Sequence, residues 1–138
     1  MSTPVVETPV YTVQATVARN LLLTANQRLH RAQVAQRTAQ LRLLGFAETR
    51  RHLGFLRLDG RWRCDVDVER PTRARRDAAN LQPTLKALID GVVDAKLLPD
   101  DDDAHLVGPF PRRAPALFRQ RDMACRLSLR FTPEAGRS

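Results

Sequence analysis

Four adjacent carboxylates, Asp100 to Asp103, stand out in a chain that is otherwise strongly basic. Their ionised forms repel one another, so the tract needs either open water or a counter-charge. A solvated acidic loop meets this need, and so does a site for a hard, oxygen-preferring cation such as Mg²⁺, with Mn²⁺ as a plausible substitute. Asp77 and Asn80 stand at the start of an expected helix before the tract and add oxygen donors. We therefore expect this helix start and the tract to share a divalent ion.

Three charged residues of the same expected helix, Lys86, Asp90 and Asp94, are spaced four apart and line one helical face. The simple interpretation is a pair on a solvated surface, worth about 0.3–0.5 kcal/mol. In the functional interpretation, Lys86 holds a phosphate or stabilises a leaving oxygen, and Asp90 helps to bind the cation. We assign Asp94 to the surface. The three histidines are scattered without a metal-binding spacing, and only His105 lies close to the acidic tract.

The charge balance points to a polyanionic partner. The chain has 23 Lys and Arg against 15 Asp and Glu, a net charge of +8, and all the basic residues except Lys86 and Lys96 are Arg. Long stretches with Arg and no acid attract phosphate backbones, although heavy Arg usage also fits a GC-rich genome. The arginines that we expect to contact DNA are Arg28, Arg73, Arg75, Arg76, Arg112 and Arg113. Arginines for phosphates and carboxylates for a metal together predict metal-assisted phosphodiester hydrolysis.

Length and composition predict one domain over 1–138, with loose ends at 1–9 and 133–138. No apolar run approaches the roughly 20 residues of a membrane span, and the N-terminus lacks the order of a secretory signal. We therefore expect no membrane partner and a cytoplasmic location, in a bacterial or phage-infected host cell. Cys64 and Cys125 are expected to be buried reduced thiols, with a disulfide or a ligand pair as the alternative.

Strands are expected where apolar residues alternate, over Tyr11–Val17, Arg61–Glu69 and Met123–Phe131. Asp59-Gly60 predicts a tight turn that joins His52–Leu58 to Arg61–Glu69 as a hairpin. His105–Val107 adds a possible short strand.

Two helices complete the expected fold. The first covers about 27–44, ends near Gly45, and has an apolar face made by Leu29, Ala32, Ala39 and Leu43. The second covers about 81–96, with Asn80 as N-cap and an apolar stripe made by Leu81, Leu85, Leu88 and Val92. This order predicts an α/β (α+β) fold, a small mixed sheet of four to five strands with two helices packed on one face.

The region from Arg75 to Val107 resembles the signature of the RusA-type Holliday-junction resolvases, and most closely an actinophage-like subgroup. The matching segments are Arg75-Arg76-Asp77-Ala78-Ala79-Asn80-Leu81-Gln82, Lys86-Ala87-Leu88-Ile89-Asp90 and Leu98-Pro99-Asp100-Asp101-Asp102. Two features depart from the common pattern. Ala79 stands where the family has its second aspartate, and three extra residues lie between Gln82 and Lys86.

The resemblance implies a Mg²⁺-dependent homodimer that nicks opposing strands of a four-way DNA junction symmetrically, in recombination or repair. Asp77, Lys86 and one of Asp101 and Asp102 match the catalytic residues. Because of Ala79, we expect Asn80 or Asp90 to complete the metal ligands, in a set drawn from Asp77, Asn80, Asp90, Asp101 and Asp102. The alternatives are a non-catalytic, basic DNA- or RNA-binding module and an inactive junction binder.

Overall fold

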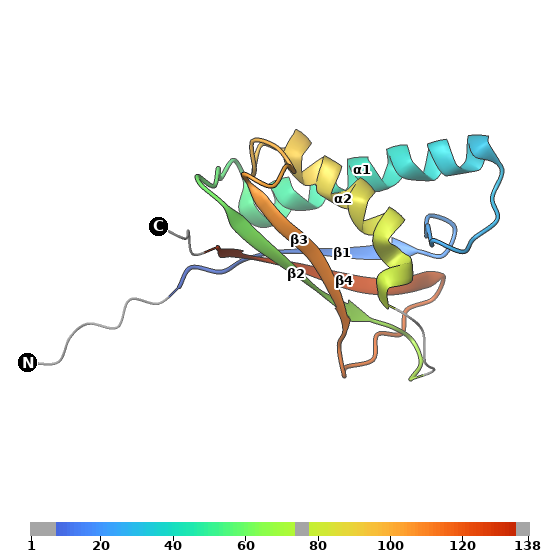
Figure 1. Cartoon of the computed structure of the whole chain (residues 1–138). Coiled ribbons are helices and arrows are strands. Elements are labelled where there is room, and N and C mark those ends of the chain that lie inside the picture. Colours follow the sequence, from blue (N-terminus) through green and yellow to red (C-terminus); the bar gives the residue numbers. More distant parts are fainter. Residues whose placement is uncertain (1–7, 74–77, 135–138) are drawn as a thin grey trace, which may run out of the picture.

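The computed structural model describes residues 8–73 and 78–134. One four-stranded mixed sheet is covered on one face by two helices (Figure 1), as the sequence predicted. The elements in chain order are β1 (Tyr11–Ala18), α1 (Arg31–Leu53), β2 (Trp62–Glu69), the 3-10 turn η1 (Ala78–Leu81), α2 (Gln82–Asp94), β3 (Leu106–Arg113) and β4 (Met123–Pro133). Within the described ranges, neither helix has the length and the apolar character needed to cross a bilayer.

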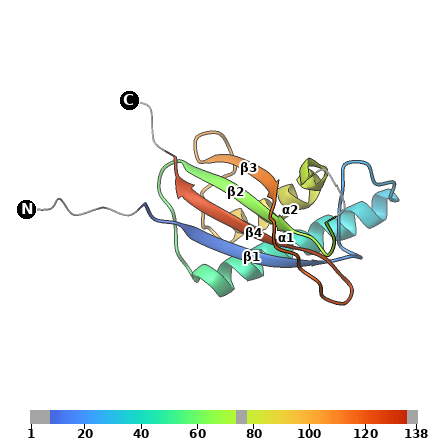
Figure 2. The same ribbon diagram turned by 90° about the horizontal axis from the view of Figure 1, so that it is seen from below.

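The strands follow the order β1-β4-β2-β3 across the sheet (Figure 2). β4 is antiparallel to both β1 and β2, whereas β3 is parallel to β2. Two parallel neighbours cannot be joined by a tight turn and need a long crossover, which α2 provides here. This crossover places α2 over the sheet.

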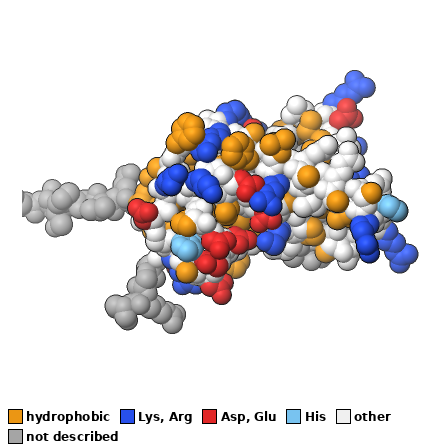
Figure 3. All heavy atoms as spheres, turned by 90° about the horizontal axis from the view of Figure 1, so that it is seen from above, with side chains coloured by type: hydrophobic (Ala, Val, Ile, Leu, Met, Phe, Trp, Pro, Cys, Tyr) orange, Lys and Arg blue, Asp and Glu red, His pale blue; other side chains and the backbone are white. Residues whose placement is uncertain are grey.

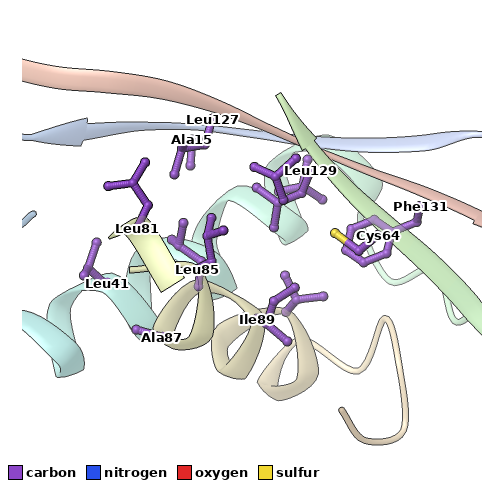
Figure 4. Packing of buried hydrophobic residues seen from close by; sticks show 14 of the residues in the cluster. Ala15, Leu41, Cys64, Leu81, Leu85, Ala87, Ile89, Leu127, Leu129 and Phe131 are labelled. Carbon is purple, nitrogen blue, oxygen red and sulfur yellow. The ribbon is translucent and has the colours of Figure 1, made fainter. Parts of the chain in front are cut away.

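The core lies between the sheet and the helices. Leu81, Leu85, Leu88 and Val92 are buried, which confirms the predicted stripe of the second helix. Leu85 and Ile89 point toward Leu129 and Phe131 of β4 (Figure 4). Cys64 and Cys125 are both buried and free. The prediction of two reduced thiols is therefore confirmed.

The prediction that the first helix ends near Gly45 is wrong, because α1 continues to Leu53. Gly45 lies at the crossing of the two helices, where an added Cβ would be 2.2 Å from the Leu88 carbonyl oxygen. Gly91 of α2 lies equally close to α1, since a Cβ added there would be 2.0 Å from the Arg42 carbonyl oxygen. These two glycines allow the helix backbones to touch, and Gly45 serves packing rather than helix termination.

The predicted apolar face of the first helix is also wrong. Leu43 is 65% exposed, while the buried residues of α1 are Leu41, Gly45 and Thr49, which are four apart. The close contact at Gly45 determines which side of α1 faces α2. Leu43 therefore points away from the core.

The predicted hairpin does not form. β2 pairs with β4 on one edge and with β3 on the other, so no edge is left for 52–58. Asp59-Gly60 instead lies in the connection from α1 to β2, where Gly60 has a φ of +86°. The short strand expected at His105–Val107 is longer than predicted and extends from Leu106 to Arg113.

Candidate active site

Lys86 joins the acidic tract to α2. Its Nζ donates to Asp101 Oδ2 at 3.1 Å and to Asp90 Oδ1 at 3.4 Å. Asp90 lies one turn further along α2, whereas Asp101 comes from the loop that follows the helix. We call Lys86, Asp90 and Asp101 the Lys86 cluster.

The Lys86 cluster is open to solvent, and Lys86 and Asp101 stay ionised. The Lys86 side chain is 67% exposed. Its hydrogen bond to Asp101 raises the pKa of Lys86 and lowers the pKa of Asp101, so both remain ionised over a wide pH range. Exposed ion pairs of this kind contribute at most about 1 kcal/mol. Stability alone therefore gives little reason for two carboxylates to converge here.

The four aspartates of the tract differ in what they contact. The Asp100 carboxylate accepts the Asp101 backbone N–H at 2.7 Å, and Asp102 Oδ1 lies 2.6 Å from His105 Nδ1. Asp103 is exposed. The sequence left Asp101 and Asp102 as alternatives, and Asp101 is the one that reaches Lys86.

Contacts with a preceding loop hold the start of α2. The buried Thr84 hydroxyl donates to the Leu23 carbonyl at 2.6 Å and accepts the Leu23 N–H at 2.9 Å. The Ala25 N–H donates to the Asn80 carbonyl at 2.9 Å. Asn80 lies in η1, not at the N-cap that the sequence predicted, since Leu81 takes that position.

An ion pair between the helices holds the other end of α2. Arg42 of α1 donates to both Asp94 oxygens, at 2.5 Å and 2.7 Å. The hydrogen bond from Arg42 lowers the pKa of Asp94. Asp94, which the sequence assigned to the surface, thus helps to orient the helix that bears Lys86 and Asp90. No local pattern revealed this contact, because its partners are 52 residues apart.

An apolar hollow of about 340 Å³ adjoins the Lys86 cluster. Lys86 and Asp90 contribute to its lining, together with apolar side chains from the loop before α1, from α1 and from α2, among them Leu23, Leu29, Val34, Pro83 and Ala87. The exposed Arg28 belongs to this loop. On the helix-covered side of the molecule, acidic side chains gather with basic ones beside them (Figure 3).

The other predicted site residues that the structure describes are separate from the Lys86 cluster. Asp77, Arg75 and Arg76 lie outside the described residues. Arg113 donates to the Thr72 carbonyl and lines a shallow hollow with the exposed Arg73. Arg112 pairs with Asp67 at 2.6 Å on the uncovered face of the sheet. Among the predicted DNA-binding arginines that the structure describes, Arg28 and Arg112 therefore lie in different parts of the molecule, whereas Arg73 and Arg113 share one hollow.

Two carboxylates, and not three, converge in the part of the chain that can be described. Within 8–73 and 78–134, no group of three His, Cys, Asp or Glu side chains is arranged to hold a metal ion. Asp90 and Asp101 are the pair of hard oxygen donors that approach a common positive charge.

No protein-family model matches this chain, and no curated protein matches it.

Proposed function

We propose that this protein is a divalent-metal-dependent endodeoxyribonuclease that cuts branched DNA, with four-way junctions as its substrate. One observation carries the proposal: Asp90 of α2 and Asp101 of the acidic tract both approach Lys86 Nζ, within 3.4 Å. All three residues belong to the segment that resembles the RusA signature.

The donor set fits a hard cation. An ammonium group already lies between two carboxylates in the Lys86 cluster, so the place accommodates positive charge, and carboxylate oxygens are the ligands that Mg²⁺ and Mn²⁺ prefer. Asp90 and Asp101 would hold the ion, with Asp77 and Asn80 as further candidate ligands. A bound divalent ion lowers the pKa of an attacking water and neutralises charge on the leaving oxygen.

Lys86 has its own part in this proposal. Its exposed ammonium can donate hydrogen bonds to a phosphate oxygen while Asp101 Oδ2 keeps the side chain oriented, and the other oxygen of the Asp101 carboxylate would then bind the ion. An Arg in its place would offer a wider, planar fork, whereas the compact ammonium concentrates its charge at one point. This suits a group that must lie close to a single phosphate.

The charge balance and the resemblance indicate the substrate and the assembly. A net charge of +8 favours a DNA backbone as the partner. The resemblance adds junction specificity and a homodimer, in which two Lys86 clusters would cut opposing strands in the cytoplasm. A homodimer predicts twice the monomer mass in analytical ultracentrifugation.

Cleavage of a labelled four-way junction tests the proposal. We expect symmetric nicks on the junction with Mg²⁺, none with EDTA, and none on a linear duplex of the same sequence. Asp101→Asn should reduce the cleavage rate by at least about 10²-fold, a usual size for loss of one catalytic group. It should leave junction binding in EDTA intact. Asp103→Asn, an exposed neighbour in the same loop, is the matched control and should cut normally. Equal rates for both variants would contradict the proposal.

The second candidate function is a non-catalytic junction or nucleic-acid binder. Ala79 and the two-carboxylate cluster favour it, because a metal site with fewer carboxylates binds its ion less strongly. It predicts DNA binding without cleavage at any concentration of Mg²⁺ or Mn²⁺, for the native chain as for Asp101→Asn.

A further inference from the structure

A second hollow of about 340 Å³ lies beyond the ends of β1 and β2. Its described lining residues include two arginines and no acid: Arg19, Leu22, Arg70, Pro71, Thr72 and Ala124. Lys86, Asp90 and Asp101 are not among them. Two guanidinium groups and a hydroxyl are hydrogen-bond donors whose charge and geometry match a phosphate.

Backbone hydrogen bonds hold both arginines in place. The Arg19 N–H donates to the Asp122 carbonyl at 2.9 Å, which ties the end of β1 to the turn before β4. The Phe118 N–H donates to the Arg70 carbonyl at 3.0 Å, which ties the end of β2 to the segment after β3. A ligand that binds between these positions needs little ordering of the backbone, which lowers the entropic cost of binding.

Arg70 and Arg19 differ in burial. Arg70 is only 8% exposed, which is unusual for an arginine, while Arg19 is exposed. The hollow thus combines a charged residue held inside the structure with one that is open to an arriving ligand. Charge-assisted hydrogen bonds gain strength where water is partly excluded.

Further arginines surround the loop at 70–73. Arg119 Nε donates to the Pro71 carbonyl at 2.7 Å, and Arg113 donates to the Thr72 carbonyl. Arg113 and Arg73 also line the neighbouring hollow. Five arginines, from the turn after β1, the loop after β2, β3 and the segment after β3, therefore concentrate positive charge around one loop. Such a field attracts a polyanion.

We propose that Arg19, Arg70 and Thr72 form a phosphate subsite, distinct from the Lys86 cluster, that binds a backbone phosphate of a DNA strand. The loop with Asp101 leads into the start of β3, whereas 70–73 follow the end of β2 (Figure 1). Because β2 and β3 are parallel, these loops lie at opposite ends of the strands. The subsite therefore binds DNA away from the acidic tract. This inference rests on the DNA-binding part of the proposed function and is independent of cleavage.

Salt-dependent binding of the full chain tests the subsite. Fluorescence anisotropy would follow a labelled four-way junction in EDTA over a range of NaCl concentrations. Arg19→Ala should weaken binding about tenfold and should reduce the slope of log K against log[salt] by about 0.9, the value for one lost phosphate contact on duplex DNA. Arg61→Ala removes the same charge from an exposed position just before β2 and should leave the slope unchanged.

A second measurement does not depend on DNA geometry. In an NMR titration with dimethyl phosphate, the Nε–Hε signals of Arg19 and Arg70 should shift together in the native chain and in Arg61→Ala, but Arg70 should not respond in Arg19→Ala. Arg70→Lys keeps the charge of the buried residue without the guanidinium fork, so it serves where Arg70→Ala fails to fold, and it should also weaken DNA binding.

Equal slopes for Arg19→Ala and Arg61→Ala would overturn the subsite, and so would a native chain that binds no DNA. Sedimentation with vesicles of anionic phospholipid is the comparison, and binding to these vesicles but not to DNA would also overturn the subsite. A junction that is bound with the predicted change of slope but is never cut would support the subsite and contradict the hydrolytic proposal. The two failures are therefore distinguishable.

Discussion

Replacing Gly91 by Ala sets two opposite effects against each other. Alanine is favoured over glycine inside a helix by about 1 kcal/mol, so propensity alone predicts a more stable protein. At this position, however, the new Cβ would lie 2.0 Å from the Arg42 carbonyl oxygen and 2.6 Å from the Phe46 nitrogen. Both neighbours are backbone atoms of α1 that cannot rotate away. The helices would have to move apart.

The separation of the two helices determines how much stability Gly91→Ala loses. Overpacking of a tight core costs about 1–3 kcal/mol, and rigid backbone neighbours place this site at the upper end, near 3 kcal/mol. Subtracting the propensity gain leaves a net loss of about 2 kcal/mol, or roughly 6 °C in Tm for a chain of this size. The same movement would strain the Arg42–Asp94 pair that orients α2.

Urea unfolding followed by far-UV circular dichroism measures this loss. Gly91→Ala should lower the midpoint concentration without a change in the m-value. Ala39→Gly, at an exposed position of α1, is the control and should show only the propensity term of about 1 kcal/mol. A Gly91→Ala chain as stable as the native protein, or more stable, would refute the close contact between the helices.

Two further predictions concern the residues that position and charge the site. Thr84→Val keeps the buried volume but leaves the Leu23 N–H and carbonyl without the Thr84 hydroxyl, so the free energy of unfolding should fall by about 2–4 kcal/mol. Thr12→Val on the exposed side of β1 is the control. A loss below about 1 kcal/mol for Thr84→Val would be inconsistent with the two hydrogen bonds. Because the Lys86 hydrogen bond lowers the pKa of Asp101 below 3.8, its contribution is complete above that pH and is lost as the pH falls through the folded-state value. Urea unfolding measured between pH 2 and 7 tests this contribution. At neutral pH, Asp101→Asn should be less stable than the native chain by under about 1 kcal/mol, and the difference should vanish in acid. A difference that stays constant with pH would argue against the Lys86–Asp101 ion pair.

The sequence by itself determined the elements whose signals are local. Alternation predicted β1, β2 and β4, and a stripe at helical spacing predicted α2, because each side chain's direction follows from its own backbone. The spacing of four residues placed Lys86 beside Asp90 for the same reason. The net positive charge and the candidate chemistry likewise required no coordinates.

Only the tertiary structure decided the features that join distant residues. Whether β2 pairs with its neighbour in sequence or with β4 depends on which edge is free, and a local Asp-Gly signal cannot show this. Gly45 is indistinguishable in sequence from a helix terminator, and becomes a packing residue once Leu88 lies against it. Tertiary structure also makes Asp101, and not Asp102, the partner of Lys86. It likewise places Arg19 and Arg70 in the lining of one hollow. Such contacts depend on how the chain closes on itself, which no short period in the sequence encodes.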